Sequence, residues 1–372
     1  MEIQPITAIF TSKQTIAESV QFLEQIKYDY PAWEAQGFFQ NATSPAMYVY
    51  RIHQKSGNSQ LGLVAGVSLD DYITEHIKRH EHTLVAKEVR QAALLKERGA
   101  VVKPVLLAHR YHTGLADKLS AIANSAPLQT ITLEDIEEEH SFWKIDDEET
   151  IRQLREWFAK EITIAYIADG HHRFSSVARL YQQLSSTGAY NPYTHLICAI
   201  FPGRALRIHN FNRAVSIFEN GLTPLAFMAH LSEFAHIKPM ENPQQPTLPH
   251  TLTMYLRQEW FELTWKNETL MNSLEEGLPS MDVSMLNYYV LQQIGGVEDV
   301  RNDERIHYVE GPQGLGALAE ISNKHNAVGF CLHPLSWDAF SKVIDHGLVL
   351  PPKSTWFEPR MKNGLIIQKM DA

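Results

Sequence analysis

Residues 162–184 combine an apolar strand, a sharp turn and a helix, and this order limits the folds that the chain can adopt. The run ITIAYIAD is typical of a buried strand, and DGHHR follows it with almost no loop. Val177, Leu180, Tyr181 and Leu184 then recur at the spacing of one helix face. The segment therefore indicates a protein of mixed α and β structure, with a polar turn where the helix begins.

This turn holds five residues whose side chains and backbone suit an anion. Gly170 permits close backbone approach, Arg173 can grip two phosphate oxygens, and His171 and His172 add donors or metal ligands. The unpaired amides at a helix start attract anions as well. Asp169 could alternatively cap the helix while its neighbours pair with carboxylates. Five such residues in one turn favour an anion or metal site.

A second polar cluster, HEHT at 80–83, precedes the helix expected at 84–98. Glu81 could act as a general base or a metal ligand, and Thr83 could cap the helix or contact an anion. The cluster lacks the histidine spacing of zinc proteases. A solvated loop before the helix is the alternative interpretation.

Composition excludes several classes of protein. The 372 residues carry a formal net charge of −10, which argues against a nucleic-acid partner. Cys198 and Cys331 are the only cysteines, so neither a disulfide framework nor a cysteine zinc site is expected. No apolar run is long enough to cross a membrane, and the first residues lack a signal-peptide pattern. We therefore expect a cytoplasmic protein.

Periodicity and turn residues give a coarse map of an α+β or mixed α/β chain. Helices are expected at 16–28, 84–98, 146–160, after Gly170, from Thr223-Pro224, and at 281–296; strands are expected at 46–52, 61–67, 101–109, 162–169, 194–201, 251–257 and 260–266. Asp146 and Glu149 resemble a capping box. The map predicts two domains, 1–205 and 206–372.

The closing segment PPKSTWFEPR contains further candidates for ligand contact. Lys353, Ser354 and Arg360 could reach an anionic ligand or a substrate from the second domain. A surface turn anchored by Trp356 and Phe357 would explain the same residues without a ligand.

These motifs together resemble a known family. HE-x-T, VVKPVLL, ADGHHR, NRAV and PPKSTWFEPR are similar to signatures of an uncharacterised bacterial family, domain of unknown function 1015. More distantly, residues 75–185 resemble the ParB/sulfiredoxin-like fold, in the branch of the nucleotide-dependent free-serine kinases. The resemblance implies such a core in the N-terminal domain, followed by a second α+β domain.

The kinase resemblance also implies roles for individual residues. The turn from Asp169 to Arg173, with Thr83, would hold the phosphates of ATP or ADP, and Asp169 would also bind Mg²⁺. Glu81, together with His80, would activate the hydroxyl group of a small metabolite. The expected function is thus phosphoryl transfer between a nucleotide and a hydroxylated small molecule.

Two alternatives remain open at this point. A metal-dependent hydrolase would use a mixed nitrogen and oxygen site formed by His80, His82, Asp169, His171 and His172. A non-enzymatic, ParB-like regulatory protein would respond to a nucleotide without turning it over.

Overall fold

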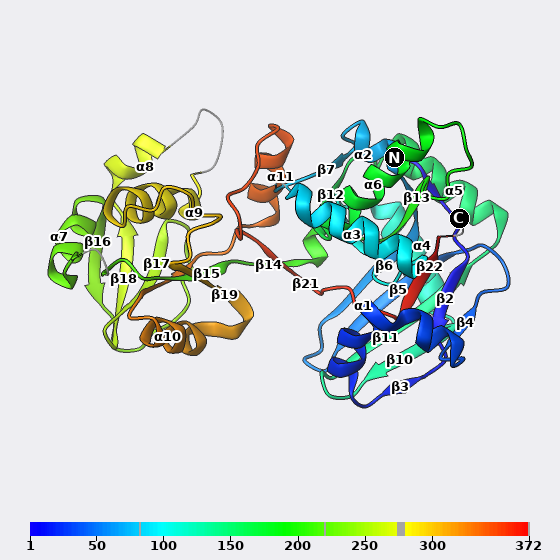
Figure 1. The fold of residues 1–372 in the computed structure, drawn as a ribbon, viewed down its shortest axis with the longest axis horizontal. Helices are drawn as coiled ribbons and strands as arrows, with labels where there is room; N and C mark the ends of the chain where they lie inside the picture. The colour runs from blue at the N-terminus through cyan, green and yellow to red at the C-terminus, as the bar shows by residue number, and fades with distance from the viewer. Residues whose placement is uncertain (82, 219–220, 274–279, 371–372) are drawn as a thin grey trace. The chain divides into compact units, whose positions relative to one another are not determined.

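The computed structural model describes residues 1–81, 83–218, 221–273 and 280–370. The chain divides into two compact units (Figure 1). The first unit comprises Met1–Arg207 together with Pro359–Ala372, and the second comprises Ile208–Glu358. Both units contain helices and sheets, so the mixed α+β class predicted from the sequence is confirmed.

The first unit is built around one large mixed sheet. Its strands are β1 (Ile3–Gln4), β3 (Thr15–Ile16), β5 (Met47–Gln54), β6 (Ser59–Ser68), β7 (Ile77–Lys78), β9 (Val105–His109), β10 (Gln129–Leu133), β11 (Glu138–Ile145), β12 (Ala165–Asp169) and β13 (His195–Pro202). They run in the order β3-β10-β11-β5-β6-β13-β9-β12-β7, and β1 pairs with β6. β12 is antiparallel to β9 and parallel to β7, which places the end of β12 near one edge of the sheet.

A smaller sheet in the same unit ties the end of the chain to its beginning. It contains β2 (Ala8–Thr11), β4 (Phe39–Asn41), β8 (Ala100–Val101) and β22 (Ile366–Lys369), in the order β4-β2-β22-β8. The segment that starts at Pro359 therefore belongs structurally with residues near the N-terminus.

Helices of the first unit follow the apolar periodicity of the sequence. They are α1 (Ser19–Ala35), α2 (Leu69–Ile73), α3 (Val85–Arg98), α4 (Thr113–Ala123), α5 (Glu148–Lys160), α6 (His171–Ser185) and the short 3-10 turn Gly203–Ala205. α3 stops at Gly99, whose φ of 66° is the left-handed conformation of a helix C-terminus. α3 and α6 pack side by side (Figure 1). The Ser176 hydroxyl on α6 donates to the Glu88 carbonyl on α3.

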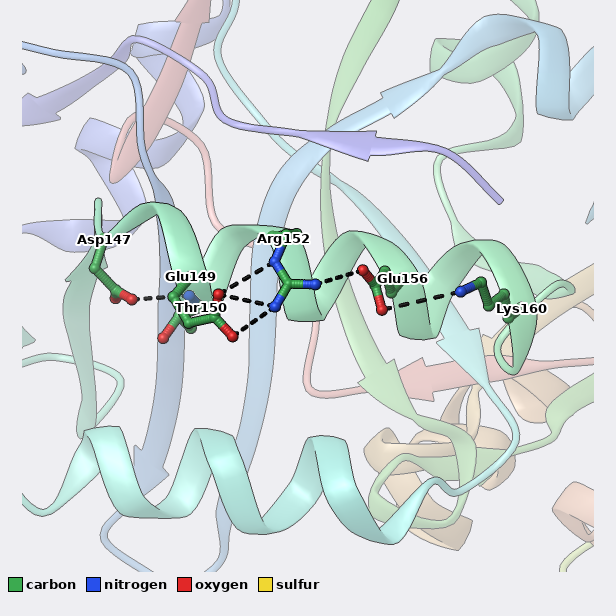
Figure 2. A network of polar contacts seen from close by, with 6 residues as sticks. All are labelled: Asp147, Glu149, Thr150, Arg152, Glu156 and Lys160. Carbon is green, nitrogen blue, oxygen red and sulfur yellow. Dashed lines mark hydrogen bonds and ion pairs between the residues drawn. The ribbon is translucent and has the colours of Figure 1, made fainter.

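The start of α5 corrects one detail of the sequence map. Asp147, not Asp146, caps the helix: its carboxylate accepts from the Thr150 amide at 2.8 Å (Figure 2). Asp146 instead pairs with Lys144 at 2.7 Å. The helix begins at Glu148, two residues later than expected, because Asp147 still adopts the extended backbone of a cap.

An exposed ladder of charges continues along α5. Arg152 bridges Glu149 and Glu156, and Lys160 pairs with Glu156 (Figure 2). Exposed pairs at this spacing contribute little to stability, so they support the helix without defining a site.

The second unit has its own sheet and core. Its elements are β14 (Arg207–His209), β15 (Phe211–Val215), α7 (Pro224–Phe234), β16 (Ala235–Pro239), β17 (Thr251–Leu256), β18 (Glu259–Trp265), α8 (Asn267–Ser273), α9 (Asp282–Met285), a π-helix (Leu286–Ile294), β19 (Ile306–Glu310), a 3-10 turn (Gly311–Gln313), α10 (Gly314–Lys324), β20 (Val328–Leu332), α11 (Trp337–Asp345) and β21 (Trp356–Glu358). The main sheet has the order β16-β18-β17-β20-β15-β19, and β14 pairs with β21.

Two expectations for this unit are confirmed and one is wrong in part. β17 and β18 form the predicted hairpin, and Thr223 caps α7 with Pro224 in its first turn. The helix expected at 281–296 does not run as one regular α-helix: α9 passes into the π-helix. α9 has Met281 at its N-cap position, and the buried carboxylate of Asp282 accepts from the Trp265 indole.

Among the described residues, no helix combines the length and the apolar character that a bilayer-spanning segment requires.

Candidate functional site

The turn between β12 and α6 depends on Gly170. This residue has φ 106° and ψ 27°, and its carbonyl accepts the first helical hydrogen bond, from the Phe174 amide at 2.9 Å. A Cβ atom at Gly170 would lie 2.5 Å from Nη2 of Arg173. Glycine is required for two reasons here, since the backbone is left-handed and the Arg173 side chain folds back across the same space.

Three cationic side chains surround the Asp169 carboxylate. Arg173 Nη2 donates to Oδ2 at 2.8 Å, Lys103 Nζ lies 3.2 Å from Oδ2, and Arg360 Nη2 donates to Oδ1. Burial alone would raise the pKa of Asp169, but the charges of Arg173, Lys103 and Arg360 hold it well below its usual range. Asp169 therefore stays ionised, and the cluster still has two positive charges in excess.

A cavity of about 190 Å³ opens beside this cluster. Four cations line it, namely Lys27, Arg98, Lys103 and Arg173, and the described residues of its lining include no carboxylate. Burial and the nearby charge of Arg173 lower the pKa of Lys103 to about 8 and that of Arg98 to about 10. Such crowding of like charges favours an anion in the cavity.

The rest of the cavity wall is apolar or aromatic. Its side chains come from α1, α3, α6 and the segment before β9, and they include Tyr28, Leu94, Leu95, Val101, Val102 and Val177. A wall that is partly cationic and partly apolar suits a ligand with an anionic group and a less polar part.

His80 contacts His171, the first residue of α6. Their ring centroids lie 4.2 Å apart in an edge-to-face arrangement, and both rings are buried. Burial lowers the pKa of His80 to about 4, and burial together with His80 lowers the pKa of His171 well below its ordinary value. Both imidazoles are therefore neutral at pH 7.

Glu81 contacts this histidine pair. Its Oε1 lies 3.5 Å from Nδ1 of His171, while Nε2 of His171 faces the main-chain amide of His80 at 3.5 Å. Because Nε2 is then the acceptor, the single proton of the neutral ring belongs on Nδ1, where it faces Glu81. Glu81 is thus held at the start of α6 while its side chain keeps 36% of its surface exposed.

The remaining predicted residues lie in different surroundings. The Thr83 hydroxyl donates to Glu88 on α3, and His172 is the half-buried second residue of α6. Within the second unit, Ser354 donates to the Pro351 carbonyl at 2.6 Å, and Lys353 Nζ lies 4.9 Å from the Phe211 ring centroid. Of the three candidates in the closing segment, the structure thus brings Arg360 to Asp169.

A metal centre finds little support in this arrangement. No group of three or more histidine, cysteine or carboxylate side chains in the described part of the chain could hold a metal ion. His82, one of the ligands considered from the sequence, lies outside the described residues. Asp169 offers little to Mg²⁺ because its carboxylate already contacts three cations. We assign to Asp169 the role of holding those cations in place.

Sequence reasoning did not single out Lys27, Arg98 or Lys103. Lys103 lies in the VVKPVLL motif, but its side chain gives no local sign that it contacts a turn at Asp169. Lys27 and Arg98 lie in helices, at positions where a charged side chain would ordinarily be expected to contact solvent.

Three of the solved structures that this chain resembles have low sequence identity to it. A conserved hypothetical protein from Pyrococcus furiosus is 14% identical, with a TM-score of 0.36 over 81% of this chain and 95% of that chain. A free serine kinase in complex with AMP is 12% identical, with a TM-score of 0.37 over 81% and 91%. SbnI from Staphylococcus aureus, truncated at its C-terminus, is 12% identical, with a TM-score of 0.41 over 81% and 85%.

A comparison with models of protein families gives a clearer result than the comparison with solved structures. A search of curated proteins found no match. The model of one family, described as "Protein of unknown function (DUF1015)", matches residues 8–284 and so covers most of the chain. This match confirms the resemblance that the HE-x-T and DGHHR motifs indicated, and the chain belongs to that family.

Proposed function

We propose that this protein binds a nucleotide at the start of α6 and transfers a phosphoryl group to a small hydroxylated metabolite. The observation that carries the proposal is the cavity beside Asp169, lined by Lys27, Arg98, Lys103 and Arg173 without a carboxylate among its described residues. Phosphoryl transfer depends mainly on positioning and on neutralising charge, and this cavity supplies both.

The phosphates would meet the turn in a defined way. The amides that precede the first hydrogen bond of α6 have no partner within the helix, and the helix dipole favours negative charge there. Asp169 orients Arg173 and Lys103, and a phosphate would share these two cations with it. The apolar side chains from Leu94 to Val102 would face the less polar part of the nucleotide.

Glu81 is the proposed base. It accepts the proton of the substrate hydroxyl as that oxygen attacks the terminal phosphorus, and the bond from this phosphorus to its bridging oxygen breaks. The shortened nucleotide leaves with its new terminal charge against the cations of the cavity. His171 positions Glu81 through Nδ1, and neutral His80 supports His171 by edge-to-face packing.

Either ATP or ADP would suit the cationic wall. Mg²⁺ carried by the nucleotide would neutralise part of the phosphate charge, as it does in other phosphoryl transfers. The residues of the chain would bind the remaining phosphate oxygens and exclude water from the cavity.

Binding and transfer can be tested separately. Isothermal titration with ATP, ADP, GTP and CTP in the presence of Mg²⁺ should show saturable binding of at least one nucleotide. Lys103→Met should weaken that binding at least tenfold, an effect of about 1.4 kcal/mol, because it removes one cation and leaves Arg173 and Arg360 on Asp169. Lys87→Met is the matched control, since Lys87 is exposed on α3 and does not line the cavity.

Transfer is followed by phosphorus NMR with a panel of hydroxylated metabolites. Glu81→Gln should retain nucleotide binding and abolish product formation. A folded protein that binds none of the four nucleotides, or a Lys103→Met variant with unchanged affinity, would refute the proposal.

A further inference from the structure

The second unit contains a polar cavity of about 250 Å³ that plays no part in the proposed phosphoryl transfer. Its lining comes from the strand β15 and the residue before it, the loop before β17, the start of α9, the end of β20, the segment 333–336, the first turn of α11 and the segment before β21. The charged or titratable side chains in this lining are Arg213, His250, Asp282 and His333. Two of these, Arg213 and Asp282, are among the most deeply buried charged residues of the unit.

Arg213 is a buried cation without a carboxylate partner. Only 1% of its surface is exposed, and its hydrogen bonds go to the main-chain carbonyls of Phe211, Pro352 and Lys353. No carboxylate in the described part of the chain forms an ion pair with it, and its Nε atom has no hydrogen-bond partner there, although the Tyr308 ring centroid lies 5.4 Å from its guanidinium carbon. A buried charge of this kind is costly unless something compensates for it.

Asp282 supplies the opposite charge in the same lining. It is 7% exposed, and its carboxylate accepts from the Trp265 indole at 3.0 Å and from the His250 main-chain amide at 3.1 Å. Its nearest cationic candidate is the His250 ring, at 3.6 Å. These contacts use two of the roughly four acceptor positions of a carboxylate, so Asp282 can still accept from a ligand.

The backbone of His250, whose amide donates to Asp282, adopts a strained conformation. Its φ of 66° lies in the left-handed region, which a residue with a Cβ atom rarely adopts. The hydrogen bond from its amide to Asp282 holds this conformation. Strain of this type is concentrated at ligand sites, where the surrounding structure maintains it.

We infer that this cavity binds a small zwitterion of the free amino acid type, with its carboxylate toward Arg213 and its ammonium group toward Asp282. A purely anionic ligand would place a negative charge beside Asp282, and a purely cationic ligand would place a positive charge beside Arg213. A zwitterion compensates both groups at once.

This inference does not rest on the proposed phosphoryl transfer, because the whole lining belongs to the second unit. The site provides either a sensor of a free amino acid or a holding site for one, and binding is the property common to both.

The experiment is a thermal-shift and calorimetric screen of the full-length protein against the free amino acids. Each amino acid is paired with the hydroxy acid of the same skeleton, such as alanine with lactate and glycine with glycolate. At least one amino acid should bind saturably, and its hydroxy acid should bind at least tenfold more weakly. Asp282→Asn should reduce amino acid affinity at least tenfold, whereas Asp338→Asn, an exposed carboxylate on α11 outside the cavity, should not.

Circular dichroism and the unfolding midpoint check that each variant is folded. Should Asp282→Asn fail to fold, His333→Gln replaces it, because His333 lines the cavity and is less buried. The inference is wrong if no amino acid binds the folded wild-type protein, if amino and hydroxy acids bind equally, or if the cavity variants bind like wild type. Lys103→Met should retain amino acid binding, so that failure of the nucleotide site is recognised separately.

Discussion

The Arg173 guanidinium occupies the place that a side chain at Gly170 would need: a Cβ atom there would lie 2.5 Å from Nη2 of Arg173. From this position Arg173 reaches Asp169 on the preceding strand. The glycine of DGHHR is therefore coupled to the arginine of the same motif, and through it to the charge cluster at the start of α6.

Replacement of Gly170 by alanine should damage both stability and ligand binding. The left-handed backbone at φ 106° should cost about 1–3 kcal/mol of unfolding free energy, and the displaced Arg173 should lose its contact with Asp169. We expect nucleotide affinity to fall at least tenfold, an effect of about 1.4 kcal/mol. Urea unfolding and calorimetry measure the two effects.

Gly188 provides the matched control for this change. It also has a left-handed backbone, with φ 70°, but a Cβ atom there would meet no atom within 4 Å. Gly188→Ala should show the backbone strain alone and keep full nucleotide affinity. Equal losses of affinity in the two variants would show that Arg173 packing is not the cause.

The affinity for a nucleotide should depend on pH through Lys103. Burial and Arg173 lower the pKa of Lys103 to about 8, against the opposing charge of Asp169. A bound phosphate favours the protonated amine, so binding takes up a proton when the pH exceeds this value. Affinity should therefore fall as pH rises above about 8, approaching tenfold per pH unit.

Lys103→Arg separates this group from the others at the site. A guanidinium at position 103 stays charged over this range, and Arg98, whose pKa is about 10, is still mostly charged at pH 9, so the affinity of the variant should change little between pH 7 and pH 9. Calorimetry in buffers of different ionisation enthalpy also counts the protons taken up. A wild-type protein that shows no proton uptake near pH 9 would contradict the assignment.

Local sequence was sufficient to locate the turn but not the cluster around it. The strand, Gly170 and the start of α6 are adjacent in the chain, so apolar periodicity and turn chemistry were enough to place them. Arg360 is 191 residues from Asp169 and reaches it because the chain returns to the first unit at Pro359. A prediction that divides the chain at a single domain boundary cannot represent a C-terminal segment that belongs to the first unit.

Burial explains what was missed in the second unit. Asp282 lies near the start of the helix expected at 281–296, and the sequence gives no sign that its carboxylate is buried. Its carboxylate is instead taken by Trp265 and His250, which become its neighbours only when β18 and α9 pack together. Arg213 belongs to the NRAV motif, and the sequence does not show that β15 is buried along its whole length.

The position of Arg360 should depend on an anchor two residues away. Lys362 Nζ contacts Glu138 Oε2 at 2.9 Å, and Glu138 also pairs with the buried His140. Burial would raise the pKa of Glu138, but the hydrogen bond with His140 and the charge of Lys362 outweigh it and lower this pKa to about 2. Lys362 therefore faces an ionised partner at neutral pH.

Lys362→Met should release this anchor and weaken nucleotide binding by a few fold, through Arg360, without touching the cavity. Lys369→Met is the control, because Lys369 lies in the same C-terminal segment and pairs with Glu34 at a more exposed position. Nucleotide affinity should fall in Lys362→Met and stay unchanged in Lys369→Met. Identical affinities for both variants would indicate that Arg360 does not depend on this ion pair.

Stability should decrease on mild acidification because buried histidines stay neutral in the folded protein. The pKa of His80 is lowered to about 4 by burial, and a histidine in the unfolded chain takes up its proton near pH 6.5. Between these values the unfolded state holds the extra proton, so the unfolding free energy falls as pH falls. The contribution of His80 should reach about 1.4 kcal/mol per pH unit in that window.

Urea titrations at pH 7, 6 and 5 measure how the unfolding free energy changes with pH. This slope should be smaller by about one proton in His80→Asn than in wild type. His53→Asn, at an exposed position on β5, should leave the slope unchanged, and a wild-type slope in His80→Asn would mean that His80 is already protonated when folded.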